Sequence, residues 1–123
     1  MIDLKVFEGM KLTAEKALRT TEFGTYTQAI VLVTNTEKAY HAVIKDALSE
    51  KKTDEAALIQ EMQTAGNTKI RHILCMWYDG GIDFPSFAFR EMLLAMDPEN
   101  SEASMFVTTL DGVSEIKMYA TMP

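Results

Sequence analysis

Two segments of the chain are apolar without interruption, and they predict the centre of the fold. Residues 29–33 are Ala, Ile, Val, Leu and Val, and residues 70–78 become apolar as the segment proceeds towards Trp77. Uninterrupted apolar runs rich in β-branched residues are typical of strands covered on both faces. We therefore predict two inner strands that lie beside each other.

A helix is predicted between residues 34 and 48. Thr34 and Glu37 have the spacing of a capping box, in which two side chains cap the first turn of a helix. The apolar residues that follow recur at the spacing of one helix face, at Tyr40, Val43, Ile44, Ala47 and Leu48.

A second helix is predicted to begin at Thr53 and to end at Gly66. Thr53 is a suitable N-cap, and the negative charges of Asp54 and Glu55 favour the positive end of a helix. Gly66 suits the left-handed conformation that ends many helices. Because helices would join the two apolar strands, we predict a crossover unit with parallel strands.

The N-terminal segment predicts a strand followed by a short helix. Ile2, Leu4 and Val6 alternate with polar residues, which indicates a half-buried strand that ends near Gly9. Residues 13–19 then predict a short helix with its apolar residues on one side.

A hairpin is predicted near the C-terminus. Asp111-Gly112 is a turn sequence between the two apolar segments 105–110 and 113–120. Pairing Leu110 with Val113 would gather apolar pairs on one face of the hairpin, with Val107 opposite Ile116 and Met105 opposite Met118.

Residues 84–96 predict a helix that is apolar on nearly every side. Phe87 and Leu94 would project on the same side as Arg90 and Glu91, where a surface helix is normally polar. An apolar side of this kind indicates a contact surface, and we predict a homodimer or other homo-oligomer in which these residues form the interface.

The predicted elements combine into one α/β (or α+β) domain that spans residues 1–123. The predicted order is β-(α)-β-α-α-β-α-β-β, with a mixed sheet of about four to five strands, helices packed on it and a C-terminal hairpin. From residue 29 onward this order resembles the thioredoxin-like topology without its final helix. The two-cysteine motif of that family is absent, since Cys75 is the single cysteine, so the resemblance implies no activity.

Composition excludes several classes of function. The formal net charge of -6 and the dispersed basic residues disfavour nucleic acid as a partner. The longest apolar run is far shorter than the ~20 residues of a membrane-spanning helix, so we predict no membrane partner. A single Cys75 and an N-terminus without a basic, apolar leader favour a cytoplasmic protein.

The segment between residues 79 and 86 is the candidate ligand-binding loop. Asp79, Gly80, Gly81, Asp83 and Ser86 join a predicted buried strand to a predicted helix. Free backbone N–H groups at such a junction can hold an anion. A plain strand-to-helix turn is the simpler interpretation, because no phosphate-loop triplet follows and the two acids would repel an anion.

Metal binding and nucleophilic catalysis are weaker interpretations. Asp79 and Asp83 could share a divalent cation, but only Glu91 is near in sequence as a third ligand. His72 and Cys75 are three apart in a predicted strand and therefore point to opposite faces, so they cannot chelate one ion. No metal site is predicted.

Catalysis by a nucleophile would pair Cys75 or Ser86 with His72 or His41, and no catalytic motif surrounds any of them. We find no cofactor motif either. The sequence therefore predicts a small acidic domain of unassignable specific function that acts through protein–protein contacts, including self-association. The alternative is a small-molecule, anion or metal-binding domain, possibly an enzyme, with its site at residues 79–86.

Overall fold

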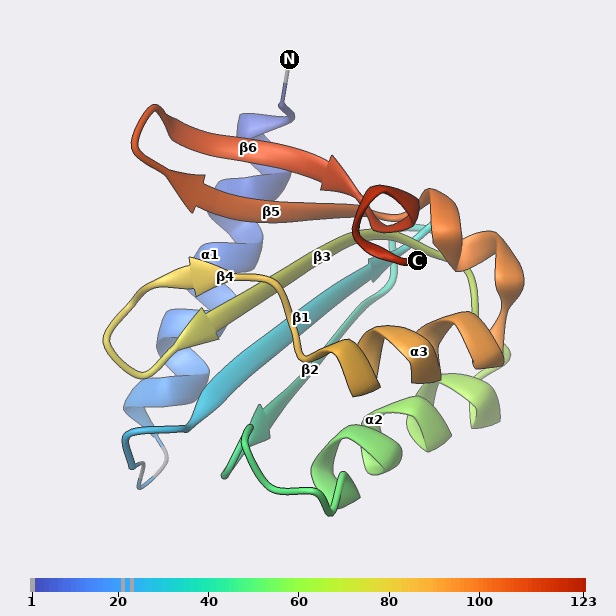
Figure 1. Cartoon of the computed structure of the whole chain (residues 1–123), viewed down its shortest axis with the longest axis horizontal. Coiled ribbons are helices and arrows are strands. Elements are labelled where there is room, and N and C mark those ends of the chain that lie inside the picture. The colour runs from blue at the N-terminus through green and yellow to red at the C-terminus, as the bar shows by residue number, and fades with distance from the viewer. Residues whose placement is uncertain (1, 21, 23) are drawn as a thin grey trace.

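A computed structural model of the chain describes residues 2–20, 22 and 24–123. These residues form one mixed sheet between two layers of helix (Figure 1). The strands follow one another in the sheet in the order β2 (Ala39–Ile44), β1 (Gln28–Thr34), β3 (Ile70–Trp77), β5 (Ser104–Thr109) and β6 (Gly112–Lys117). The short strand β4 (Ile82–Asp83) pairs with the end of β3.

The helices cover the two faces of the sheet separately. α1 (Leu4–Arg19) packs on one face, and α2 (Thr53–Thr64) and α3 (Phe87–Met96) lie side by side on the other (Figure 1). Two short 3-10 helices, η1 (Pro98–Glu102) and η2 (Met118–Thr121), flank the C-terminal hairpin. Each face has its own apolar core, and the α/β class predicted from the sequence is confirmed.

The two apolar segments are indeed neighbouring inner strands, β1 and β3; β1 is buried almost throughout, and β3 is buried at Ile70 and from Ile73 to Met76. They are antiparallel, however, and the prediction of a parallel pair is wrong. The chain reverses direction in an additional hairpin before it enters α2, so β3 returns against β1. The parallel pair in the sheet is β3 with β5.

Residues 39–44 form strand β2 and not the predicted helix. The Thr34 hydroxyl accepts a hydrogen bond from the Lys38 N–H at 3.1 Å, which closes a hairpin turn where a helix cap was predicted. Glu37 has a φ of 65° in this turn, a conformation incompatible with a helix. Because of this extra strand, the element order differs from the thioredoxin-like order.

The N-terminal segment is one helix, α1, and the predicted strand at residues 2–6 is wrong. Asp3 caps it by accepting a hydrogen bond from the Val6 N–H. The alternation of Leu4 and Val6 is incidental, because the residues that face the sheet recur at helical spacing, at Phe7, Met10, Ala14 and Leu18.

The second half of the chain follows the predicted order with shifts at α3 and in the hairpin, and the predicted strand at residues 113–120 ends at Lys117, where η2 begins. β4 intervenes before α3, which therefore begins at Phe87, three residues later than predicted, and is capped by Ser86. The C-terminal hairpin forms, but Thr109 pairs with Gly112. The turn residues are thus Leu110 and Asp111. The register differs from the prediction by two residues, which keeps the same side chains on each face.

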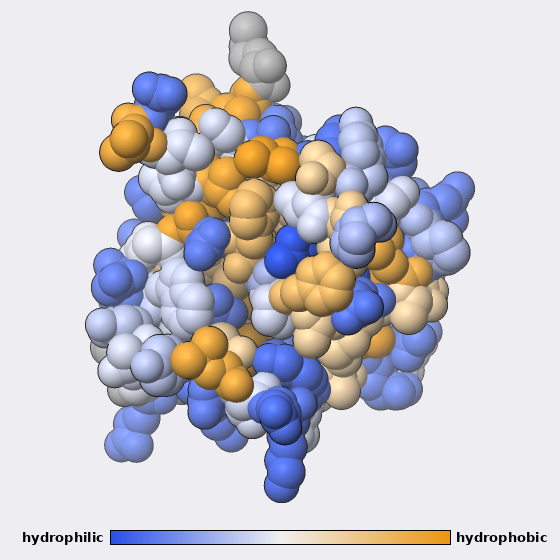
Figure 2. Space-filling view, in the orientation of Figure 1, coloured by the Kyte–Doolittle hydropathy of each residue, from blue (hydrophilic) through white to orange (hydrophobic). Residues whose placement is uncertain are grey.

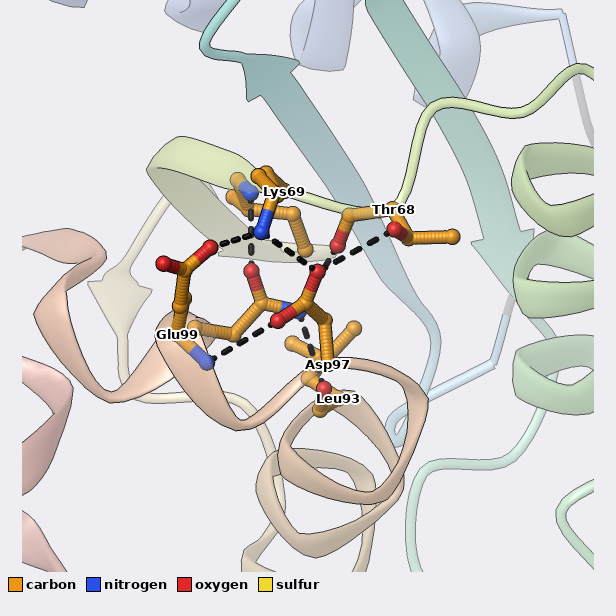
Figure 3. A network of polar contacts seen from close by, with 7 residues as sticks. Thr68, Lys69, Leu93, Asp97 and Glu99 are labelled. Atoms are coloured by element: carbon orange, nitrogen blue, oxygen red, sulfur yellow. Dashed lines mark hydrogen bonds and ion pairs between the residues drawn. The ribbon is translucent and has the colours of Figure 1, made fainter.

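A polar network fixes the end of α3 to the start of β3. Asn100 is fully buried, and its Oδ1 accepts the Ile70 N–H at 2.8 Å. Its Nδ2 donates to the carbonyls of Thr68 and Leu93, both at 2.9 Å. Figure 3 shows the neighbouring contacts, in which Asp97 accepts from Thr68 and pairs with Lys69. These contacts hold α3 in a defined position on the sheet.

In the part of the chain that the structure describes, no helix is both long enough and apolar enough to cross a bilayer. Figure 2 shows apolar residues in separate patches among polar ones on the face that carries α2 and α3.

Candidate functional site

The N-terminal ends of α2 and α3 lie on the same side of the molecule, because the two helices run side by side in the same direction (Figure 1). The first turn of α2 carries Asp54 and Glu55, whose charges interact favourably with the helix dipole. Asp54 is engaged in the fold, since its Oδ2 accepts the Lys45 N–H at 3.0 Å. Glu55 faces inward and is only 3% exposed.

Glu55 is an unusual buried acid. The Lys52 ammonium lies 3.7 Å from its Oε2, and this ammonium donates a hydrogen bond to the Ala47 carbonyl at 2.9 Å. At 3.7 Å this contact is an ion pair that is longer than a hydrogen bond. Buried carboxylates normally accept several hydrogen bonds, so an acid held mainly by one cation has capacity for a ligand that carries N–H or O–H donors.

Cys75 lies in the same apolar core as Leu58 and Met62 of α2. It is fully buried in β3, opposite Asp83 of β4. Burial raises the pKa of the Cys75 thiol far above its ordinary value, and the carboxylates of Asp83 and Glu55 raise it further. The thiol therefore stays protonated, which argues against the predicted possibility of a Cys75 nucleophile. The two carboxylates belong to different elements, Glu55 to α2 and Asp83 to β4.

The start of α3 contributes an aromatic and cationic cluster. The Ser86 Oγ accepts the Phe89 N–H at 3.1 Å and so caps the helix. The Arg90 guanidinium lies 5.6 Å from the ring centroids of both Phe84 and Phe87. Its Nε is buried without a hydrogen-bond partner. Two aromatic faces thus hold this cation beside the helix N-terminus.

The predicted ligand loop is divided between two places. Asp79, Gly80 and Gly81 form the tight turn between β3 and β4, where Gly80 has a φ of 92° and the Asp79 carboxylate accepts the Gly81 N–H. Asp83 and Ser86 lie further on, and Ser86 alone caps the helix. The predicted direct junction from strand to helix is therefore wrong, and ligand binding by these residues stays a prediction.

A surface hollow of about 510 Å³ adjoins this turn. It is lined by Trp77, Asp79, Gly80, Gly81, Ile82, Asp83 and Thr108. Trp77, which lines this hollow, also packs against the apolar core that lies under α2 and α3.

The two histidines do not join this region. His72 stacks on Phe106 in the core beneath α1, with a ring-centroid distance of 5.4 Å. Burial lowers the pKa of His72, although Glu115, whose Oε1 is 3.3 Å from its Nδ1, acts in the opposite direction. His41 is exposed on the edge strand β2. Across residues 2–20, 22 and 24–123, no three His, Cys, Asp or Glu side chains are arranged to hold a metal ion.

The predicted interface residues of α3 have different surroundings. Phe87 is 43% exposed, and Glu91 is exposed as well. Leu94 packs against the core of its own chain, and Arg90 is half-buried between two aromatic rings. The apolar side of the helix is thus partly covered from within the chain.

Sequence reasoning missed the buried pair of Lys52 and Glu55. Glu55 was interpreted only as a charge that complements the helix dipole. Its spacing from Leu58 and Met62, three and seven residues on, places it on the buried face of α2, and this signal could have identified it.

No protein-family model matches the chain, and no curated protein matches it significantly. Solved structures do match over nearly its full length. Cytidine deaminase from Mycobacterium leprae is 16% identical, with a TM-score of 0.66 and coverage of 95% of this chain and 97% of that one. A mutant cytidine deaminase from Mycobacterium tuberculosis is 12% identical, with a TM-score of 0.72 and coverage of 100% and 94%. The enzyme from Bacillus anthracis is 13% identical, with a TM-score of 0.70 and coverage of 96% and 87%.

This likeness overturns the main functional prediction. The interpretation as a domain of unassignable function that acts through protein–protein contacts is wrong, because the solved structures that resemble the chain are enzymes for a small molecule. The alternative, a small-molecule-binding domain, fits better. The chain has the fold of the cytidine deaminases.

Proposed function

We propose that the chain is a small-molecule-binding domain whose ligand is a pyrimidine nucleoside or a close analogue. The observation that carries this proposal is the position of Glu55. It is a buried carboxylate on the first turn of a helix, paired with the Lys52 ammonium at 3.7 Å, in the fold of cytidine deaminases. A base edge that presents N–H groups would satisfy such an acid.

The surrounding residues support a ligand with an aromatic ring and polar substituents. The hollow beside β4 offers Trp77 and the carboxylates of Asp79 and Asp83. Phe84 and Phe87 stand at the start of α3, and aromatic side chains of this kind stack readily on bases. The residues predicted from the sequence, Asp79 to Ser86, therefore keep a proposed role as one wall of the site.

Calorimetric titration of the purified protein with cytidine, uridine and adenosine tests the proposal. We expect binding of the pyrimidine nucleosides and a rise in melting temperature with their concentration. Glu55→Gln removes the charge with little change in shape and should weaken binding by roughly tenfold or more, as for loss of a charged hydrogen bond. Glu61→Gln, at an exposed site on the same helix, is the matched control. The absence of binding by all three nucleosides would refute the proposal.

We also infer self-association and a cytoplasmic location, each on separate grounds. The exposed Phe87 side chain supports a contact between copies, and analytical ultracentrifugation of the protein and of Phe87→Ser tests it. A monomer at every concentration would argue against this inference. The buried free thiol of Cys75 suits a reducing compartment.

A further inference from the structure

The zinc deaminases hold their metal with a two-part signature at the starts of two helices. A His-x-Glu segment supplies one ligand and the proton-transferring Glu, and a Pro-Cys-x-x-Cys segment supplies the other two ligands. In this chain, α2 begins with Thr53-Asp54-Glu55, and α3 begins within Pro85-Ser86-Phe87-Ala88-Phe89. The Glu and the Pro are present at the matching positions.

The residues at the three ligand positions do not fit zinc. Phe89 carries no donor atom and is fully buried in the apolar core. Ser86 uses its Oγ to cap α3, and Thr53 offers only a neutral hydroxyl. Zinc sites in proteins are built from Cys, His and carboxylate ligands.

Where the ligands for a metal dication are missing, a buried carboxylate needs another source of positive charge. Lys52 lies 3.7 Å from Glu55, and its side chain is 17% exposed. The Ala47 carbonyl fixes the ammonium at 2.9 Å. Arg90, the cation of α3, forms no ion pair with Glu55 and is held between two rings instead.

We propose that this chain has exchanged the metal centre of the deaminase fold for a metal-free arrangement, in which the Lys52 ammonium is the counter-charge of Glu55. The domain then does not carry out zinc-dependent hydrolytic deamination, and its ligand binding needs no metal. The proposal does not depend on which ligand is bound, so it can fail or succeed independently of nucleoside binding.

Metal analysis is the first test. Protein purified without a metal-binding tag is examined by plasma mass spectrometry and by thermal unfolding with Zn²⁺ and with EDTA. We expect no stoichiometric zinc and an unchanged melting temperature. One equivalent of zinc that is lost in a Thr53→Ala, Ser86→Ala double variant would overturn the proposal. Zinc that persists in that variant is bound elsewhere and leaves the proposal standing.

A double-mutant cycle between Lys52 and Glu55 is the second test. Lys52→Met should lower the melting temperature by roughly 5 °C or more, because it leaves a buried charge without a partner. Lys51→Met, at the exposed neighbouring lysine, is the matched control and should change it by less than about 2 °C. Lys52→Arg keeps the charge and should stay near the unmodified protein.

The coupling between the two positions decides the outcome. Adding Glu55→Gln to Lys52→Met should restore part of the lost stability, whereas adding it to Lys51→Met should not. This comparison separates the ion pair from the hydrogen bond that Lys52 also makes to Ala47. Strictly additive effects of the changes at Lys52 and Glu55 would overturn the role of Lys52.

Discussion

Replacement of Asn100 by Ala should destabilise the protein more than any other single change in its polar network. The side chain is fully buried and makes three hydrogen bonds, with the Ile70 N–H and with the carbonyls of Thr68 and Leu93. Each bond contributes about 1 kcal/mol, and buried partners left unpaired add to the loss. We expect a decrease of about 3 to 5 kcal/mol in the free energy of unfolding.

Thermal and urea unfolding, followed by circular dichroism, measure this effect. For a domain of this size the loss corresponds to a fall in melting temperature of roughly 10 to 18 °C. Asn67→Ala is the control, because Asn67 is partly exposed and makes one side-chain hydrogen bond, to the Tyr40 hydroxyl at 2.7 Å. It should lose only about 1 kcal/mol.

Asn100→Asp sharpens the test. It keeps an acceptor for the Ile70 N–H but turns a carboxylate towards the carbonyls of Thr68 and Leu93, so it should be at least as unstable as Asn100→Ala at neutral pH. If Asn100→Ala loses no more stability than Asn67→Ala, the network does not hold α3 on β3, and our account of how the candidate site is positioned is wrong.

Two further predictions concern pH and backbone conformation. Because burial lowers the pKa of His72 below its unfolded value of 6.5, the unfolded chain binds this proton more readily, and stability should fall as pH decreases below about 6.5. The stability of the His72→Phe variant should not show this decrease at low pH. The stability of His41→Gln, a change at an exposed histidine, should still show it. Gly80→Ala should destabilise the protein by about 1 to 2 kcal/mol, because Gly80 has a φ of 92°. Gly9→Ala lies inside α1 with open space around it and should stabilise the protein by about 0.5 to 1 kcal/mol. Equal effects of the two changes in denaturant unfolding would contradict this reasoning.

The sequence by itself determined the parts of the fold that depend on local pattern. The apolar runs around Ile30 and Leu74 identified β1 and β3, because an uninterrupted apolar run, typical of a strand buried on both faces, is visible in the sequence alone. α2 followed from its helical spacing and from Gly66, whose φ of 75° ends it, although Lys52 and not Thr53 is its N-cap residue. The C-terminal hairpin followed from its two apolar segments, although its turn is Leu110-Asp111. The single cysteine and the acidic charge also followed directly from composition.

Residues 34–48 show where local pattern fails. The spacing of Tyr40 and Ile44 fits a helix face and also fits the alternation of a strand, since a separation of four serves both periods. Pairing with the edge of β1 favours the strand, because β2 satisfies backbone hydrogen-bonding groups of β1 that a helix would leave unpaired. The direction of β3 and the true start of α3 then depended on that choice.

Only the tertiary structure decided the candidate site. Glu55 and Asp83 are far apart in sequence, and both carboxylates raise the pKa of the Cys75 thiol because α2 packs on β2 and α3 while β4 pairs with β3. Burial is likewise a property of packing, and it distinguishes Lys52 and Glu55 from the exposed Lys51 and Glu61, which have the same chemistry. A sequence specifies which side chains are charged, whereas the packed fold specifies which of those charges are desolvated and therefore need a counter-charge or a hydrogen-bond partner.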